Sequence, residues 1–227
     1  MDKKFKMLDL THPVSPEIPS WNGESGFEIS IKLDYQNCTP PDLFRIQKIE
    51  SNAGIGTHID APAHVIPGGR TVDQLTIEEL FAACVVIDVR SEAGEDYIIT
   101  PDVIEKFEER NGEIKPKSFV IFYTGWDKYW SEREKYHNNH RFPSIDPKVA
   151  EILLKRDIAG LGTDTLSPDT GAAGFPVHRA MLGANKFIVE NIANAKLLPS
   201  TGSKILALPM NITGGTEAPI RLIGFLS

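Results

Sequence analysis

Apolar and polar residues alternate along two segments near the N-terminus, Phe27–Leu33 and Arg45–Ser51. This period-two pattern is typical of a strand that buries one face and exposes the other. We therefore predict a half-buried strand in each segment. A shorter apolar stretch at Leu8–Leu10 predicts one more short strand.

Apolar runs in the rest of the chain predict further strands. The first, Cys84–Val89, has the composition of a fully buried strand. The others are Phe119–Tyr123, Ile158–Leu161, Lys186–Glu190, Lys204–Leu208 and Ile220–Phe225.

Three helices are predicted between these strands. Thr76 and Glu79 form a capping-box pattern at the start of a short helix, Thr76–Phe81. The segment Pro101–Asn111 has proline at the first helical position. A backbone N–H at this position would have no acceptor within the helix, so proline costs no hydrogen bond there. A third helix is predicted at Pro147–Arg156. Strands with a few interspersed helices indicate an α/β or α+β fold.

The chain of 227 residues is long enough for one large domain, which we place over residues 1–227. The net charge is −7 and the basic residues are not clustered, so neither nucleic acid nor a membrane surface is an expected partner. The apolar stretch behind the N-terminal lysines breaks at Asp9, which argues against a signal peptide. We therefore expect a cytoplasmic protein. Cys84 is predicted in the core and Cys38 in a polar loop.

The strongest local signal for chemistry is the segment GTHIDAPAH at residues 56–64. Side chains alternate along an extended segment, so His58 and Asp60 project from one face and can reach one cation together. Pro62 interrupts an ordinary strand, which turns the chain and brings His64 back beside the site. A neutral imidazole in that place suits general acid/base catalysis. The alternative is a polar loop with two surface histidines.

A second candidate group contains His178 and Glu190. Glu190 directly follows the apolar run Phe187–Val189, and a buried carboxylate is very costly without a partner. That partner is either a bound cation or, in a purely structural role, Arg179 or Lys186.

Other polar side chains allow two interpretations. Asp164 follows the predicted strand Ile158–Leu161, where it acts either in a functional site or as a loop acid that binds neighbouring hydroxyls. His12, His137 and His140 lie in polar segments and are predicted to be solvated surface residues.

Taken together, these segments resemble the cyclase family of metal-dependent hydrolases, which includes bacterial kynurenine formamidases and isatin hydrolases. Residues 56–64 resemble the family's metal motif, usually written H-x-G-T-H-x-D-x-P-x-H. The resemblance runs nearly end to end, through residues 9–12, 19–23, 123–126, 162–169 and 176–191.

The resemblance implies a swivelling β/α/β fold that forms homo-oligomers, here a homodimer or homotetramer. It implies one or two divalent cations, commonly Zn²⁺ or Mn²⁺, and hydrolysis of an amide, lactam or lactone in a small molecule. His64 would be the catalytic acid/base, and Trp21 would stand near the substrate, where its face could stack on a planar ring. The metal ligands carried over by position are His58, Asp60, His178 and Glu190.

One position departs from the family motif, whose first histidine falls at Gly54. Positions 54, 58 and 60 share a face of an extended segment, so a ligand is missing from the site itself, and we expect a gap there. The four remaining ligands suffice for one cation with an open position for water. Such a cation lowers the pKa of water toward neutrality, and His64 would carry the proton to the leaving group.

Two other functions stay open. A non-catalytic binding or regulatory protein could keep this fold with a metal site degraded at Gly54. A lyase or cyclase could use the same site, because a metal that stabilises an enolate serves either reaction. Metal content distinguishes the non-catalytic protein from an enzyme. Incorporation of ¹⁸O from solvent into the product distinguishes a hydrolase from a lyase or cyclase.

Overall fold

A closed sheet forms the body of the computed structural model, which describes residues 6–171 and 174–226. Four of its strands run parallel in the order β5 (Phe81–Asp88), β7 (Ser118–Tyr123), β9 (Gly160–Thr163) and β10 (Phe187–Glu190). The remaining strands are antiparallel to their neighbours: β4 (His58–Asp60), β12 (Glu217–Leu226), β11 (Ser203–Pro209) and β1 (Lys6–Asp9). Because β12 pairs with both β11 and β4, the sheet closes into a barrel-like ring.

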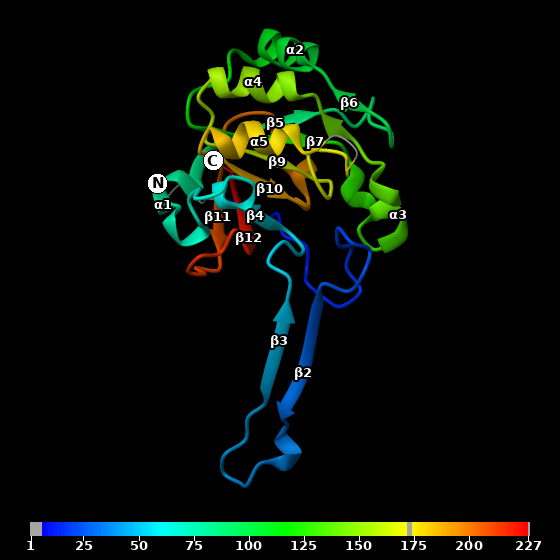
Figure 1. Cartoon of the computed structure of the whole chain (residues 1–227), viewed down its shortest axis with the longest axis vertical. Coiled ribbons are helices and arrows are strands. Elements are labelled where there is room, and N and C mark those ends of the chain that lie inside the picture. Colours follow the sequence, from blue (N-terminus) through cyan, green and yellow to red (C-terminus); the bar gives the residue numbers. More distant parts are fainter. Residues whose placement is uncertain (1–5, 172–173, 227) are drawn as a thin grey trace.

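The parallel strands are buried on both faces. Along β7, Phe119 and Ile121 face the interior of the ring, whereas Val120 and Phe122 pack against the helices outside it. This explains why these strands appear in the sequence as continuous apolar runs. The helices that cover the outer face are α2 (Pro101–Asn111), α4 (Pro147–Lys155) and α5 (Pro176–Gly183) (Figure 1).

Smaller elements complete the body. A short parallel pair joins β6 (Ile98–Ile99) to β8 (Ser144–Ile145). The helices α1 (Ile77–Leu80) and α3 (Arg133–His137) lie at the periphery (Figure 1). Among the described residues, no helix combines the length and the apolar character that crossing a bilayer requires.

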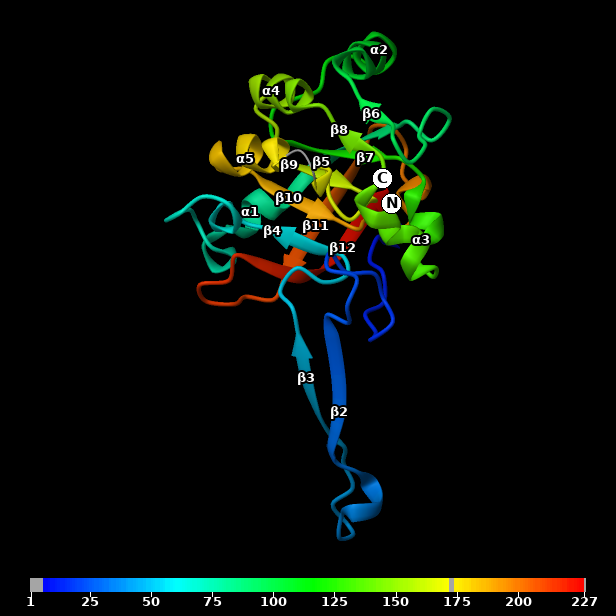
Figure 2. The same cartoon turned by 45° about the vertical axis from the view of Figure 1, so that its right-hand side comes forward.

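A two-stranded hairpin projects far from the body (Figures 1 and 2). It consists of β2 (Phe27–Leu33) and β3 (Ile46–Ser51), with Ile29 directly opposite Ile49. Both isoleucines are exposed, at 42% and 60%. The alternation did predict these two strands, but the expectation that one face would be buried is wrong. The chain's own body does not cover the apolar face.

Most of the predicted elements are confirmed. The capping box at Thr76 starts α1, with Glu79 N–H donating to the Thr76 hydroxyl at 3.3 Å. Cys84 is buried on β5 as predicted. The strand predicted at Ile220–Phe225 begins three residues earlier, at Glu217, and this difference matters for the site. The α/β fold class is confirmed.

Candidate metal centre and active site

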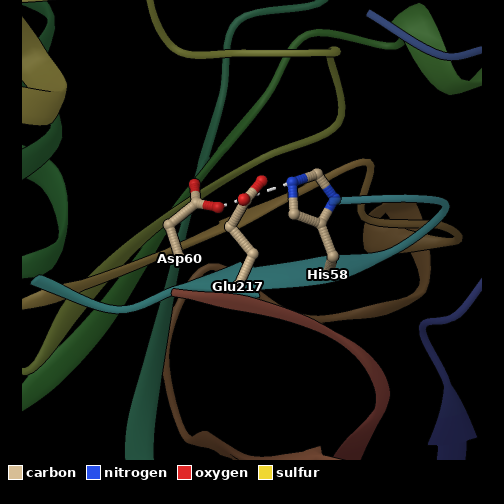
Figure 3. Close-up of side chains that lie close together, drawn as sticks. All are labelled: His58, Asp60 and Glu217. Carbon is tan, nitrogen blue, oxygen red and sulfur yellow. Dashed lines mark ion pairs between the residues drawn. The ribbon is translucent and has the colours of Figure 1, made fainter. Parts of the chain in front are cut away.

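Strand β4 carries the metal motif and lies between two strands that also supply acidic side chains. His58 and Asp60 are two residues apart and point to one face. Glu190 of β10 stands directly opposite His58, and Glu217 of β12 stands directly opposite Asp60. Paired residues of antiparallel strands share a face, so all four side chains meet there. Figure 3 shows three of them side by side.

His178 reaches the same place from the first turn of α5. The carboxylate of Asp169 accepts the backbone N–H groups of Val177 and His178, each at 3.0 Å. One oxygen of Asp169 also lies 2.8 Å from Nδ1 of His178. Asp169 therefore anchors the start of the helix and orients the imidazole with a single carboxylate.

The four predicted ligands converge. Nε2 of His58 lies 3.5 Å from Asp60 and 3.3 Å from Glu190. Nε2 of His178 lies 3.5 Å from Asp60 and 3.2 Å from Glu190. All four side chains are buried. Neither cation of the structural alternative pairs with Glu190 among the described residues: Lys186 pairs with Asp157 at 2.8 Å, and Arg179 donates to the carbonyl of Gly174.

Hydrogen bonds fix which nitrogen of each imidazole is free. Nδ1 of His58 lies 2.9 Å from the carbonyl of Gly56, which can only accept, so Nδ1 carries the proton. Nδ1 of His178 donates to Asp169 in the same way. Each Nε2 is therefore the nitrogen that faces the carboxylates, and once it is deprotonated it can offer a lone pair to a cation bound among them. Carboxylate or carbonyl partners on the far nitrogen are typical of metal-binding histidines.

The carboxylate oxygens also favour a cation. Both oxygens of Asp60 and Oε1 of Glu190 are buried and lack a hydrogen-bond partner among the described residues. Buried charges are stable only when they are paired or bind metal. Two imidazole nitrogens and several carboxylate oxygens within ligand range of one another fit a divalent ion such as Zn²⁺ or Mn²⁺.

The electrostatics of the site attract positive charge. Burial disfavours the charged form of His58, but the Glu190 hydrogen bond and the Asp60 and Glu190 charges outweigh it and raise the pKa to about 9. Burial likewise opposes charging of His178, yet Asp169, Asp60 and Glu190 raise its pKa well above the ordinary value. Burial would raise the pKa of Glu190, but the two histidines lower it. The negative charge of this site can be balanced either by protons on the two histidines or by a bound cation, and the two compete.

His64 lies at the edge of the same group. Pro62 starts a single 3₁₀ turn, Pro62–His64, which returns the chain to the site as the sequence indicated. Nδ1 of His64 lies 3.2 Å from Glu217, and its ring centroid is 5.9 Å from that of His178. Its side chain is 32% exposed, in contrast to the buried ligands. The Glu217 hydrogen bond raises the pKa of His64 against a smaller opposing effect of burial.

A cavity of about 370 Å³ adjoins the carboxylates and imidazoles. Its lining includes His58, Asp60, His64, His178, Glu190 and Glu217. The apolar wall of the same cavity is formed by Trp21, Phe175, Leu166 and Val65. The Trp21 ring stacks on His140 at 3.9 Å, and the carbonyl of Trp21 lies 2.8 Å from ring nitrogens of both His137 and His140.

Comparison with known proteins agrees with this geometry. A family model described as "Putative cyclase" matches residues 8–170. The isatin hydrolase of Roseibium aggregatum is 34% identical over 252 residues, covering 98% of this chain and 92% of that protein. The chain belongs to the cyclase family. Isatin hydrolase A from Ralstonia solanacearum has a similar structure, with a TM-score of 0.89, 28% identity and coverage of 98% of this chain and 92% of that one. The kynurenine formamidase of Salinibacter ruber is 24% identical over 96% of both chains.

The cyclase resemblance inferred from the sequence is thus confirmed, but the expected gap at Gly54 is not found. A Cβ atom at this position would overlap Oε1 of Glu217 and lie 3.3 Å from Nε2 of His58. The carboxylate of Glu217 therefore occupies the space next to residue 54. The sequence left Glu217 without a role because it lies far from the motif along the chain.

The remaining candidates have structural roles. Asp164 is buried, and its carboxylate accepts the N–H groups of Thr124 at 2.8 Å and Trp126 at 2.9 Å. Burial raises its pKa to about 6. Asp164 is thus the loop acid of the two alternatives. His12 is not a surface residue as predicted, because it is buried and stacks on Trp130 at 4.0 Å.

Proposed function

We propose that this protein hydrolyses the amide bond of a small, planar, uncharged cyclic amide of the isatin type. The observation that carries the proposal is the cavity itself. Its lining combines side chains that can bind a metal with aromatic and aliphatic ones. A flat ring can lie against Trp21 and Phe175 while its carbonyl faces the carboxylates and imidazoles.

The charge of the cavity favours a neutral substrate over an amino acid. Three acidic residues, Asp60, Glu190 and Glu217, face it, and no lysine or arginine lines it in the part of the chain that the structure describes. A free carboxylate on the substrate would find no cationic side chain to pair with. Isatin has no such group, whereas formylated kynurenine carries one.

A divalent cation held by His58, Asp60, His178 and Glu190 would polarise the substrate carbonyl and lower the pKa of water. The chain's own residues supply the remaining functions. Asp169 and the Gly56 carbonyl hold the two imidazoles in the orientation that binding requires. The apolar wall excludes bulk water from the reacting atoms.

His64 is proposed as the group that gives a proton to the departing nitrogen. Its Nδ1 is engaged by Glu217, so Nε2 is the nitrogen that can exchange a proton with a molecule in the cavity. Its partial exposure suits proton exchange with solvent between turnovers.

The metal is proposed as zinc or manganese. The two imidazole nitrogens suit zinc, and the two carboxylates together with water also suit manganese. Loading the metal-stripped protein separately with each ion and comparing turnover decides between them.

The proposed activity is tested with isatin and N-formylkynurenine as substrates for the metal-loaded protein. We expect isatin opening that EDTA abolishes, with kcat/KM at least about tenfold higher than for formylkynurenine, the effect of one unpaired charge. In H₂¹⁸O, the product should contain one solvent oxygen. Metal binding without turnover of either substrate would favour the non-catalytic alternative, and product without solvent oxygen would favour a lyase.

The hairpin supports a homo-oligomer, which we propose as a homodimer or homotetramer. Its apolar face exposes Ile29, Ile31 and Ile49, while the opposite face carries Glu28, Ser30 and Lys48. An isolated two-stranded hairpin with an uncovered apolar face is marginal in water. The hairpin points away from its own body (Figure 2), which therefore leaves the apolar face open, and we propose a second copy of the chain as the partner that covers it. Identical apolar faces are self-complementary across a two-fold axis.

Ile29→Lys is expected to shift this protein toward monomer in light scattering coupled to size exclusion. Each isoleucine contributes roughly 1.5–3 kcal/mol when buried, and a two-fold interface loses two of them. Ser30→Lys introduces the same side chain one position along, on the opposite face, and should leave the oligomer intact. A monomeric wild type, or equal behaviour of the two variants, would contradict the hairpin interface.

A further inference from the structure

The feature that the family motif does not account for is Glu217. It is the first residue of β12 and directly opposite Asp60 on β4. Its side chain is only 21% exposed and points along the same face as His58 and Asp60 (Figure 3). Ligand atoms of these three residues lie within 4.8 Å of one another.

Glu217 and a side chain at position 54 compete for the same space. A methyl group on Gly54 would overlap Oε1 of Glu217, so the end of the glutamate side chain would have to shift to make room for a histidine there. The carboxylate of Glu217 thus fills the space that the motif's first histidine would take at position 54. A carboxylate oxygen can replace an imidazole nitrogen as a ligand to zinc or manganese.

A second observation points to a ligand here. Asp60 belongs to two separate groups of potential ligands, one with His58 and Glu217 and the other with His178 and Glu190. Both of its oxygens are buried and without a hydrogen-bond partner among the described residues. Its Oδ1 lies toward His58 and its Oδ2 toward His178, so Asp60 could supply one ligand oxygen to each group.

The charge of the site also favours a second cation. Asp60, Glu190 and Glu217 are three acidic residues, and the two imidazoles are neutral when they bind metal. One divalent cation would leave the centre with a net negative charge. A second divalent cation would offset that negative charge.

We infer that Glu217 is a metal ligand that takes the place of the histidine missing at position 54. With His58 and the shared Asp60, it forms a second cation subsite. The same carboxylate holds His64 through its other oxygen, Oε2, at 3.2 Å. Glu217 thereby connects the second cation to the residue proposed as the proton donor. This inference rests on the proposed metal-dependent function and adds a ligand and a subsite to it.

The test is metal stoichiometry, measured without any substrate. The full-length protein is stripped with EDTA, titrated with Mn²⁺ by calorimetry, and examined by electron paramagnetic resonance for coupled manganese. We expect two equivalents and a coupled signal in the wild type. Glu217→Gln should bind the second equivalent at least about 100-fold more weakly, since losing even an outer partner costs roughly 10–100-fold.

Two further variants make the result specific. Gly54→Ala keeps Glu217 but places a methyl group in its space, and it should weaken the second equivalent in the same direction. Glu28→Gln removes an equal charge from the exposed hairpin and should leave both equivalents unchanged. Two tight equivalents in Glu217→Gln, or one in the wild type, would overturn the inference. No binding at all in the wild type would instead overturn the proposed metal-dependent function.

Discussion

Asp60→Asn is expected to cause the largest loss of any single substitution in this protein. Asp60 is the acid that both groups of potential ligands share, 3.5 Å from both His58 and His178 and buried with both oxygens unsatisfied. An amide keeps the shape but removes the charge that binds the cation. We expect metal affinity to fall by more than about 100-fold and turnover by more than about 10⁴-fold, because loss of the cation exceeds loss of one acid/base group.

Asp169→Asn provides the matched control for this result. It makes the same chemical change to a buried aspartate that contacts His178 rather than a cation. We expect a smaller loss of metal affinity, about 10–100-fold. The measurement is metal content by plasma mass spectrometry together with kcat, with circular dichroism to verify folding. Equal effects of the two variants would mean that Asp60 is not a ligand.

His64→Gln is expected to separate catalysis from metal binding. His64 contacts Glu217 but is a third exposed, and the four buried ligands do not depend on it. We expect metal content close to the wild-type value and a fall in kcat of roughly 10²–10⁴-fold, the usual range for a positioned acid/base group. A change in the pH profile of kcat should accompany the loss, because a titrating group has been removed.

His58→Ala is the comparison for that variant, since it removes a ligand rather than a proton donor. It should lose metal and turnover together. If His64→Gln also releases the metal, His64 is a ligand. If it alters neither metal content nor rate, another residue carries the proton.

The sequence predicted the body of the fold well because its strands are buried on both faces. Such strands appear as uninterrupted apolar runs, as in Phe119–Tyr123, whatever lies around them. The hairpin was predicted less well, because its strands have only one apolar face. Alternation at Phe27–Leu33 indicates that one face is to be covered, but it does not identify the covering surface.

The residues of the candidate site were likewise predicted only where the signal lies within one short segment of the sequence. His58 and Asp60 could be paired from the sequence because period two places them on one face of one strand. The contribution of Glu217 depends on the pairing of β12 with β4, which no local pattern reports. Asp169 was likewise missed as the partner of His178, because it lies seven residues before the start of α5 and not at the N-cap position.

A crystal structure of the zinc-loaded protein would show whether His58, Asp60, His178 and Glu190 hold a divalent cation. Anomalous scattering at the zinc edge locates the ion independently of the protein density. We expect a peak among these four side chains, with Nε2 of both histidines and the carboxylate oxygens about 2.0–2.2 Å from it. A fully loaded protein with no peak there would mean that these residues do not bind the cation.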